Sequence, residues 1–179
     1  MAALVAVVVS TQTLDVHTQA PRPLQQEVAE NEVELRDVLP QADIFRFLDD
    51  PAPHFRGYTH EPGDESSTLV GFAFFTTDLV GGVLGYKGRI TMLVGMDIAG
   101  TLTNVRVLSH SEPFGYFSID PPAFAEQFRG ASILDPLEPG KDIDAVSQAT
   151  ITIDAATRAI RLSARRVARE FLAKSLTKE

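Results

Sequence analysis

The sequence predicts an α+β fold in which an antiparallel sheet is flanked by helices and followed by a long C-terminal helix. Three runs rich in β-branched and aromatic residues, at 68–76, 90–96 and 102–109, have the length of strands. The last two are separated by Asp97-Ile-Ala-Gly100, a composition typical of hairpin turns, so they should pair antiparallel. A final long element starts near Thr152 to Asp154, both able to cap a helix, and runs to about Lys174.

Composition limits the chemistry that the chain can perform. Its 179 residues are in the range of one globular domain. The absence of Cys excludes thiol nucleophiles, Cys-ligated zinc, iron–sulfur ligation and disulfides. A net charge of −8 argues against nucleic acid as a partner, because duplex affinity depends on neutralising phosphates.

The first residues form a short apolar run. Residues 1–9 are continuously apolar but fall short of the roughly 20 residues that cross a bilayer, and they make a poor signal peptide. Two interpretations stay open, the stub of a truncated membrane anchor or export segment and a buried strand or helix start. The expected division is an N-terminal stub and linker at 1–23 and one domain at 24–179.

Other elements follow from periodicity and punctuation. Apolar residues on one side of a helical wheel predict a helix at 24–39 that ends before Pro40. A strand is expected at 44–48 and a surface loop at 49–67, which is rich in Pro, Gly, Asp and His. Pro121-Pro122 opens a short helix that reaches Phe128.

The C-terminal helix differs in charge from the rest of the chain. Residues 155–179 hold seven basic and two acidic residues, whereas the remainder holds nine basic and 22 acidic ones. A solvated face that complements the helix dipole explains this pattern, and so does docking to an acidic partner or anionic lipid.

Several familiar sites do not fit. In His110-Ser111-Glu112, a continued strand would place Ser111 on the opposite face from its neighbours, and no Gly-x-Ser-x-Gly motif presents a nucleophile. The four His are scattered, and Asp142 and Asp144 lack the Gly and distal Glu of a calcium loop. No Gly-x-Gly-x-x-Gly motif follows a strand.

Small and hydroxylated residues cluster at 144–154, immediately before the basic helix. A helix N-terminus offers unpaired N–H groups and a partial positive charge, which suit a phosphate. The alternative is that Thr152 or Asp154 merely caps the helix.

Several stretches, taken in order, resemble the FMN-binding domain family. Residues 144–150 (Asp-Ala-Val-Ser-Gln-Ala-Thr) are similar to its Asp-x-x-Ser/Thr-Gly-Ala-Thr signature, with Gln148 in place of Gly. Residues 85–90 resemble its Gly-Tyr-x-Gly-x-Ile stretch, and residues 110–115 its His-x-Glu-Thr-Pro-Gly element, without the Thr and with Phe114 inserted before Gly115. Gln127-Phe128 and the helix at 30–42 extend the resemblance to about residues 25–165. The family includes flavin-carrying components of Rnf-type electron-transport complexes and of the sodium-translocating NADH:quinone oxidoreductase, and the flavin domain of nitrous-oxide respiration regulators.

The resemblance implies an electron-transfer flavoprotein domain in which a flavin transferase esterifies FMN to Thr150. It also implies the proteins of a membrane electron-transport complex as partners, and an extracytoplasmic, periplasmic location. The expected cofactor-binding residues are Thr150 (covalent FMN), Ala149, Ser147, Gln148, Asp144, Thr152, Tyr86, Gly88, His110 and Glu112. An aromatic wall for the ring could come from Phe72, Phe74, Phe75, Tyr86, Phe114, Tyr116 and Phe117.

Two other functions stay open at this stage. The first is a structural or assembly protein that keeps the fold without flavin and binds a membrane complex through the basic helix. The second is a soluble flavoprotein that holds FMN without a covalent bond.

Overall fold

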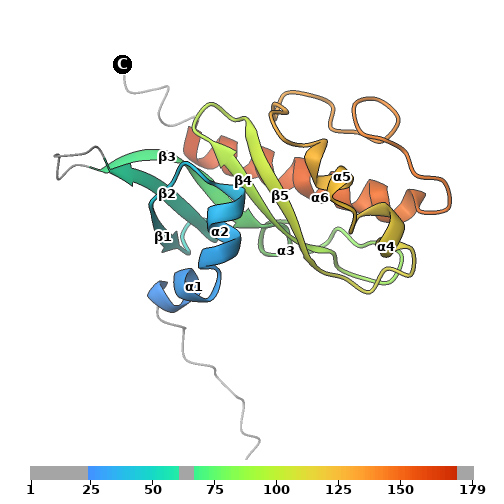
Figure 1. Ribbon diagram of the computed structural model, residues 1–179, viewed down its shortest axis with the longest axis horizontal. Coiled ribbons are helices and arrows are strands. Elements are labelled where there is room, and N and C mark those ends of the chain that lie inside the picture. The colour runs from blue at the N-terminus through green and yellow to red at the C-terminus, as the bar shows by residue number, and fades with distance from the viewer. Residues whose placement is uncertain (1–23, 61–66, 173–179) are drawn as a thin grey trace, which may run out of the picture.

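The described part of the chain is built around an antiparallel sheet. The structure, a computed structural model, describes residues 24–60 and 67–172, so the apolar run at 1–9 lies outside the described residues. The strands β1 (Ile44–Leu48), β2 (His54–His60), β3 (Ser67–Phe75), β4 (Thr91–Asp97) and β5 (Leu102–Ser109) pair in chain order. The predicted α+β class is confirmed, and Figure 1 shows the strands side by side with helices around them.

Helices cover both faces of the sheet. The N-terminal α1 (Leu24–Glu30) and α2 (Glu32–Val38) pack on one face, and the long α6 (Thr150–Val167) crosses the other (Figure 1). Short helices lie in the connections: α3 (Thr76–Leu79), α4 (Gly115–Ser118) and α5 (Pro122–Glu126). A π-helical turn at Ala168–Leu172 continues α6.

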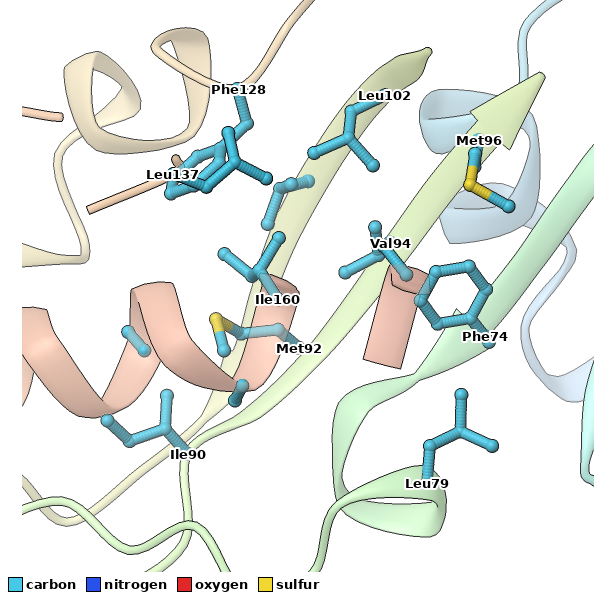
Figure 2. Close-up of a cluster of buried hydrophobic side chains, with 14 of the residues drawn as sticks. Phe74, Leu79, Ile90, Met92, Val94, Met96, Leu102, Phe128, Leu137 and Ile160 are labelled. Atoms are coloured by element: carbon cyan, nitrogen blue, oxygen red, sulfur yellow. The ribbon is translucent and has the colours of Figure 1, made fainter. Parts of the chain in front are cut away.

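The alternation of side chains along β4 explains this layering. Met92, Val94 and Met96 are fully buried in the cluster that contains α6, whereas Leu93 is buried in the cluster that contains α2. Figure 2 shows Met92 and Val94 beside Ile160 of α6. Because both faces of β4 are covered, its sequence is a nearly continuous apolar run instead of an alternating one.

The prediction of a loop at 49–67 was wrong in part, because β2 lies within it. The two His, one Arg and one Gly of β2 give it a loop-like composition, yet it pairs with a strand on each side. Gly57 is favoured there because a Cβ would overlap the side chains of Leu39 and Ala42, which follow α2. Glycine inside a strand leaves room for such close packing of a neighbouring segment.

Helix boundaries also differ from the sequence prediction. The helix expected at 24–39 breaks at Asn31, whose side chain donates to the Glu27 carbonyl at 2.8 Å. The helix expected to reach Phe128 ends at Glu126. The C-terminal helix begins at Thr150 instead of Thr152–Asp154, with Ala149 at the N-cap position and no side-chain cap. Capping by Thr152 or Asp154 is therefore wrong.

Arginines of α6 bind the loop that precedes it. Arg161 pairs with Glu138 at 2.8 Å, and Arg165 donates to the carbonyl oxygens of Ile133 at 2.9 Å and Asp135 at 2.7 Å. Some of the basic side chains of α6 therefore bind carbonyl oxygens and a carboxylate of this chain. Docking of the helix to an acidic partner stays a prediction.

Candidate functional site

Thr150 is the first residue of α6, and its side chain is exposed. It lies at a cleft of about 560 Å³, within the range of small-molecule sites, which is about 300–1,000 Å³. The cleft is lined by Tyr86, Lys87, Pro113, Phe114, Gln148, Ala149, Thr150, Ile151 and Thr152. The start of α6 thus meets two loops that are distant in sequence, one before β4 and one after β5.

The Glu112 side chain links the loop before β4 to the first turn of α6. Glu112 is 6% exposed, and its carboxylate accepts three hydrogen bonds: from the Tyr86 N–H at 2.9 Å, the Lys87 N–H at 2.8 Å and the Thr152 hydroxyl at 2.5 Å. Burial raises the pKa of the Glu112 carboxyl, but the hydrogen bonds from Thr152, Lys87 and Tyr86 hold the pKa below its ordinary value. In its ionised form, Glu112 therefore holds the loop of Tyr86 and Lys87 against the start of α6.

Two glycines of the predicted motifs make room for this arrangement. A Cβ on Gly85 would lie 2.7 Å from Oε1 of Glu112, and a Cβ on Gly115 would overlap the His110 ring. Gly88 has a φ of +144°, a conformation that favours glycine, and its carbonyl accepts the Gly85 N–H at 2.7 Å. The motif glycines thus shape the loop that presents Tyr86 and Lys87.

His110 supports the cleft without lining it. Its Nδ1 accepts the Glu112 N–H at 3.0 Å, so Nε2 carries the proton and donates to Asp120 at 2.7 Å. The ring is therefore occupied on both nitrogens by the loop after β5. Its place in the structure is that of a support for Glu112.

Gln148 adopts a backbone conformation that suits glycine. Its φ is +71°, in the left-handed region, at the position where the family signature has Gly. The turn it forms leads into Ala149, whose carbonyl accepts the Ile153 N–H at 2.9 Å and starts α6. The turn that presents Thr150 is therefore strained by its side chain.

Replacing Gln148 by glycine is expected to raise the free energy of unfolding by about 1 kcal/mol, because relief of strain exceeds the extra entropy of unfolded glycine. Urea unfolding followed by circular dichroism measures the change. Gln148→Ala is the control, since alanine keeps the strain and should give no gain. Equal stability of the glycine and alanine variants would contradict the expectation.

The other residues expected at the site lie in three places. Thr150, Ala149, Gln148, Thr152 and Tyr86 line the cleft. Gly88, His110 and Glu112 hold its walls, as described above. Asp144 and Ser147 are exposed on the approach to α6 and do not line it; the Asp144 N–H donates to Gln127 at 2.6 Å. Binding of FMN by this set stays a prediction.

Only part of the expected aromatic wall lies at the cleft. Phe72 and Phe74 are 2% and 0% exposed and belong to the core under α6, so they do not face the cleft. Of the seven aromatic residues considered, only Tyr86 and Phe114 line it. Phenylalanines in strands filled the core, which is their usual place.

The sequence interpretation missed three residues of the cleft: Lys87, Pro113 and Ile151. Lys87 and Ile151 are direct neighbours of Tyr86 and Thr150, and Pro113 follows Glu112. Adjacency to motif residues is the signal that could have found them.

A second cleft, of about 630 Å³, also borders Thr150. It shares Thr150 and Ile151 with the first and is further lined by Val80, Gly82, Val83, Leu84, Asp154, Ala155 and Arg158. Thr150 thus lines two clefts of different composition. The first has one charged lining residue, and the second has two of opposite sign.

The described residues contain neither a metal-binding group of three or more His, Asp or Glu nor a membrane-spanning helix. Asp142, considered above as a calcium ligand, instead accepts the N–H groups of Leu137 and Glu138, each at 2.7 Å. These bonds close the turn in front of α6.

One comparison with known proteins matches the part of the chain that lines the first cleft. No curated protein matches the chain. The family model of the FMN-binding domain matches residues 85–164, which include the loop of Tyr86 and Lys87, the loop of Glu112 and the start of α6. The matched segment pairs through β4 with the preceding strands in one sheet. The likeness of this chain to the FMN-binding domain family therefore rests on residues 85–164.

Proposed function

We propose that this protein is an electron-transfer domain that carries FMN as a phosphoester on Thr150. The observation that carries the proposal is the exposed Thr150 hydroxyl, which stands at a cleft within the segment that matches the family. A flavin transferase would attach the group, because a threonine hydroxyl is a poor nucleophile without an activating base or metal.

The residues present fit FMN. The cleft combines apolar and aromatic groups, which suit a flat ring, with polar groups from Gln148 and Thr152. At its edge, the uncapped N-terminus of α6 offers N–H groups to a phosphate. Lys87 supplies a positive charge in the same cleft.

Bound FMN would supply reversible uptake and release of electrons. The chain's own residues would position it: Thr150 as the point of attachment, and Tyr86 and Phe114 as walls for the ring. Glu112 would keep the two walls together through Thr152 and the Tyr86 and Lys87 N–H groups.

Thr150→Val is expected to abolish covalent attachment when the chain is co-expressed with a flavin transferase. Intact-mass measurement should show one added FMN on the unmodified sequence and none on this variant. Ser147→Ala is the matched control, because Ser147 is also exposed near the start of α6 but does not line the cleft. This variant should still gain one FMN.

Two results would contradict the proposal. One is an FMN adduct that persists in Thr150→Val, which would place the linkage elsewhere. The other is a chain without any adduct after co-expression, which would favour the flavin-free structural protein. Flavin that binds and is released on denaturation would identify the non-covalent flavoprotein.

The proposal extends to a place for the domain. The motifs resemble those of membrane electron-transport proteins, which supports an extracytoplasmic position beside such a complex. Detergent extraction of membranes from the native host, followed by purification of this chain, should recover redox proteins with it. Recovery of the chain alone would contradict this part.

A further inference from the structure

Lys87 is distinguished by its charge among the residues of the cleft. The nine lining residues include one charged side chain, that of Lys87, and the others are apolar or uncharged. Any anionic group that enters this cleft therefore meets one cation and no carboxylate among its walls. The identity of the wall residues thus favours a ligand with a negative charge.

The ammonium of Lys87 has no carboxylate partner in the part of the chain that the structure describes. Its Nζ lies 5.3 Å from the centroid of the Tyr86 ring, an interaction that leaves its hydrogen-bond donors available. Glu112 binds the Lys87 N–H of the main chain and not the ammonium. An anion in the cleft would therefore not have to displace an existing ion pair.

The main chain at Lys87 is fixed by the same buried carboxylate that holds α6. The Lys87 N–H donates to Glu112 at 2.8 Å, and Thr152 donates to the other oxygen of that carboxylate at 2.5 Å. The base of the lysine side chain is thus tied to the first turn of α6, where Thr150 lies. This link fixes the main chain from which the lysine side chain extends.

From these observations we infer that the Lys87 ammonium is the counter-charge for the phosphate of FMN and makes the cleft prefer FMN to riboflavin. The inference rests on the proposed function, because it requires the flavin to occupy this cleft. The two flavins differ only in the phosphate, which carries between one and two negative charges at neutral pH. A charge-assisted hydrogen bond to that phosphate would therefore act on one flavin and not on the other.

Arg158 provides a matched comparison. It lines the second cleft beside Thr150, it is exposed, and no ion pair of its own is found among the described residues. Replacing Lys87 or Arg158 by methionine removes one positive charge in either case. A difference between the two variants therefore reports the cleft that holds the phosphate and not the net charge of the protein.

The experiment titrates FMN and riboflavin into the full chain produced without a transferase, with dissociation constants from flavin fluorescence at low ionic strength. We expect Lys87→Met to raise the constant for FMN about tenfold and leave that for riboflavin unchanged, the scale of one charge-assisted hydrogen bond. Lys87→Arg should keep the preference for FMN. Arg158→Met should bind both flavins as the parent chain does.

Three outcomes would overturn the inference: an equal loss for both flavins in Lys87→Met, a larger loss for FMN in Arg158→Met, or a parent chain that binds neither flavin. The mass measurement on transferase-treated protein separates these from the proposed function. If the chain gains a covalent FMN but its preference for FMN over riboflavin depends on Arg158, the inference about Lys87 is wrong and the proposed function stands. If that preference depends on Lys87 but no covalent adduct forms, the covalent linkage is wrong and the inference about Lys87 stands.

Discussion

Replacing Glu112 by glutamine is expected to lower the free energy of unfolding by about 3 kcal/mol at pH 7. The carboxylate accepts from the main-chain N–H groups of Tyr86 and Lys87 and from the Thr152 hydroxyl, and it is nearly fully buried. A glutamine amide has one oxygen, so its NH₂ group would face a donor that then has no partner. A buried donor without an acceptor costs about 1–3 kcal/mol, and bonds to a charged acceptor are stronger than neutral ones.

Urea unfolding measures this effect. Glu126→Gln is the control, because Glu126 is exposed on α5 and its side chain makes no hydrogen bond or ion pair with the described residues. A change below about 0.5 kcal/mol in Glu112→Gln would contradict the role of Glu112 in holding the cleft together.

The same variant tests the pH dependence. The folded state lowers the Glu112 pKa below its ordinary value of 4.5, so the folded state favours the charged form. The stabilisation is therefore complete above pH 4.5 and is lost as the pH falls through the lower folded-state pKa. The stability difference between the parent chain and Glu112→Gln should therefore shrink as the pH falls below 4.5 and through the lower folded-state pKa. A difference that stays constant would show that the carboxylate is not ionised in the folded protein.

Replacing Gly95 by alanine is expected to destabilise the protein by about 3 kcal/mol. A Cβ at this position of β4 would overlap the carbonyl oxygen of Val38, which is the last residue of α2. That carbonyl accepts the Thr103 hydroxyl, and the Asn104 side chain donates to the neighbouring Asp37 carbonyl at 3.1 Å. Alanine would push α2 away from the strands and break these bonds, because well-packed backbones do not yield to an added methyl group.

Thermal unfolding by calorimetry is a suitable measurement for this pair of variants. Gly82→Ala is the control, because a Cβ there meets nothing within 4 Å, and its transition should move little. If Gly95→Ala unfolds at the same temperature as Gly82→Ala, the close contact between α2 and β4 is not present in solution.

Elements with regular patterns were predictable from the sequence. The strand expected at 102–109 coincides with β5, and Asp97 closes the expected turn by accepting the N–H groups of Ala99 at 2.9 Å and Thr101 at 2.8 Å. The strand β2 was missed because its burial depends on two neighbouring strands and on the end of α2, which its own composition does not reveal. Tertiary contacts overrode local composition there.

The candidate site also had parts that the local sequence predicted and parts that depend on tertiary contacts. The cluster of hydroxylated residues beside a long basic helix was predictable from the sequence, but Thr150 itself was singled out by the resemblance to the family, and the structure makes it the first residue of α6. The role of Glu112 could not, since it depends on three groups that lie 25 to 40 residues away in sequence. Lys87 was missed for a similar reason: its significance arises only when the other walls of the cleft are known to carry no charge.

The most direct test of the central claim is the visible absorption spectrum of the protein purified from its native host, recorded before and after acid precipitation. We predict flavin absorption that stays with the redissolved precipitate, at one flavin for each chain, with the phosphate linkage on the peptide that contains Thr150. A precipitate without colour, whether the flavin moves to the supernatant or was never present, would contradict the claim that this chain carries covalent FMN.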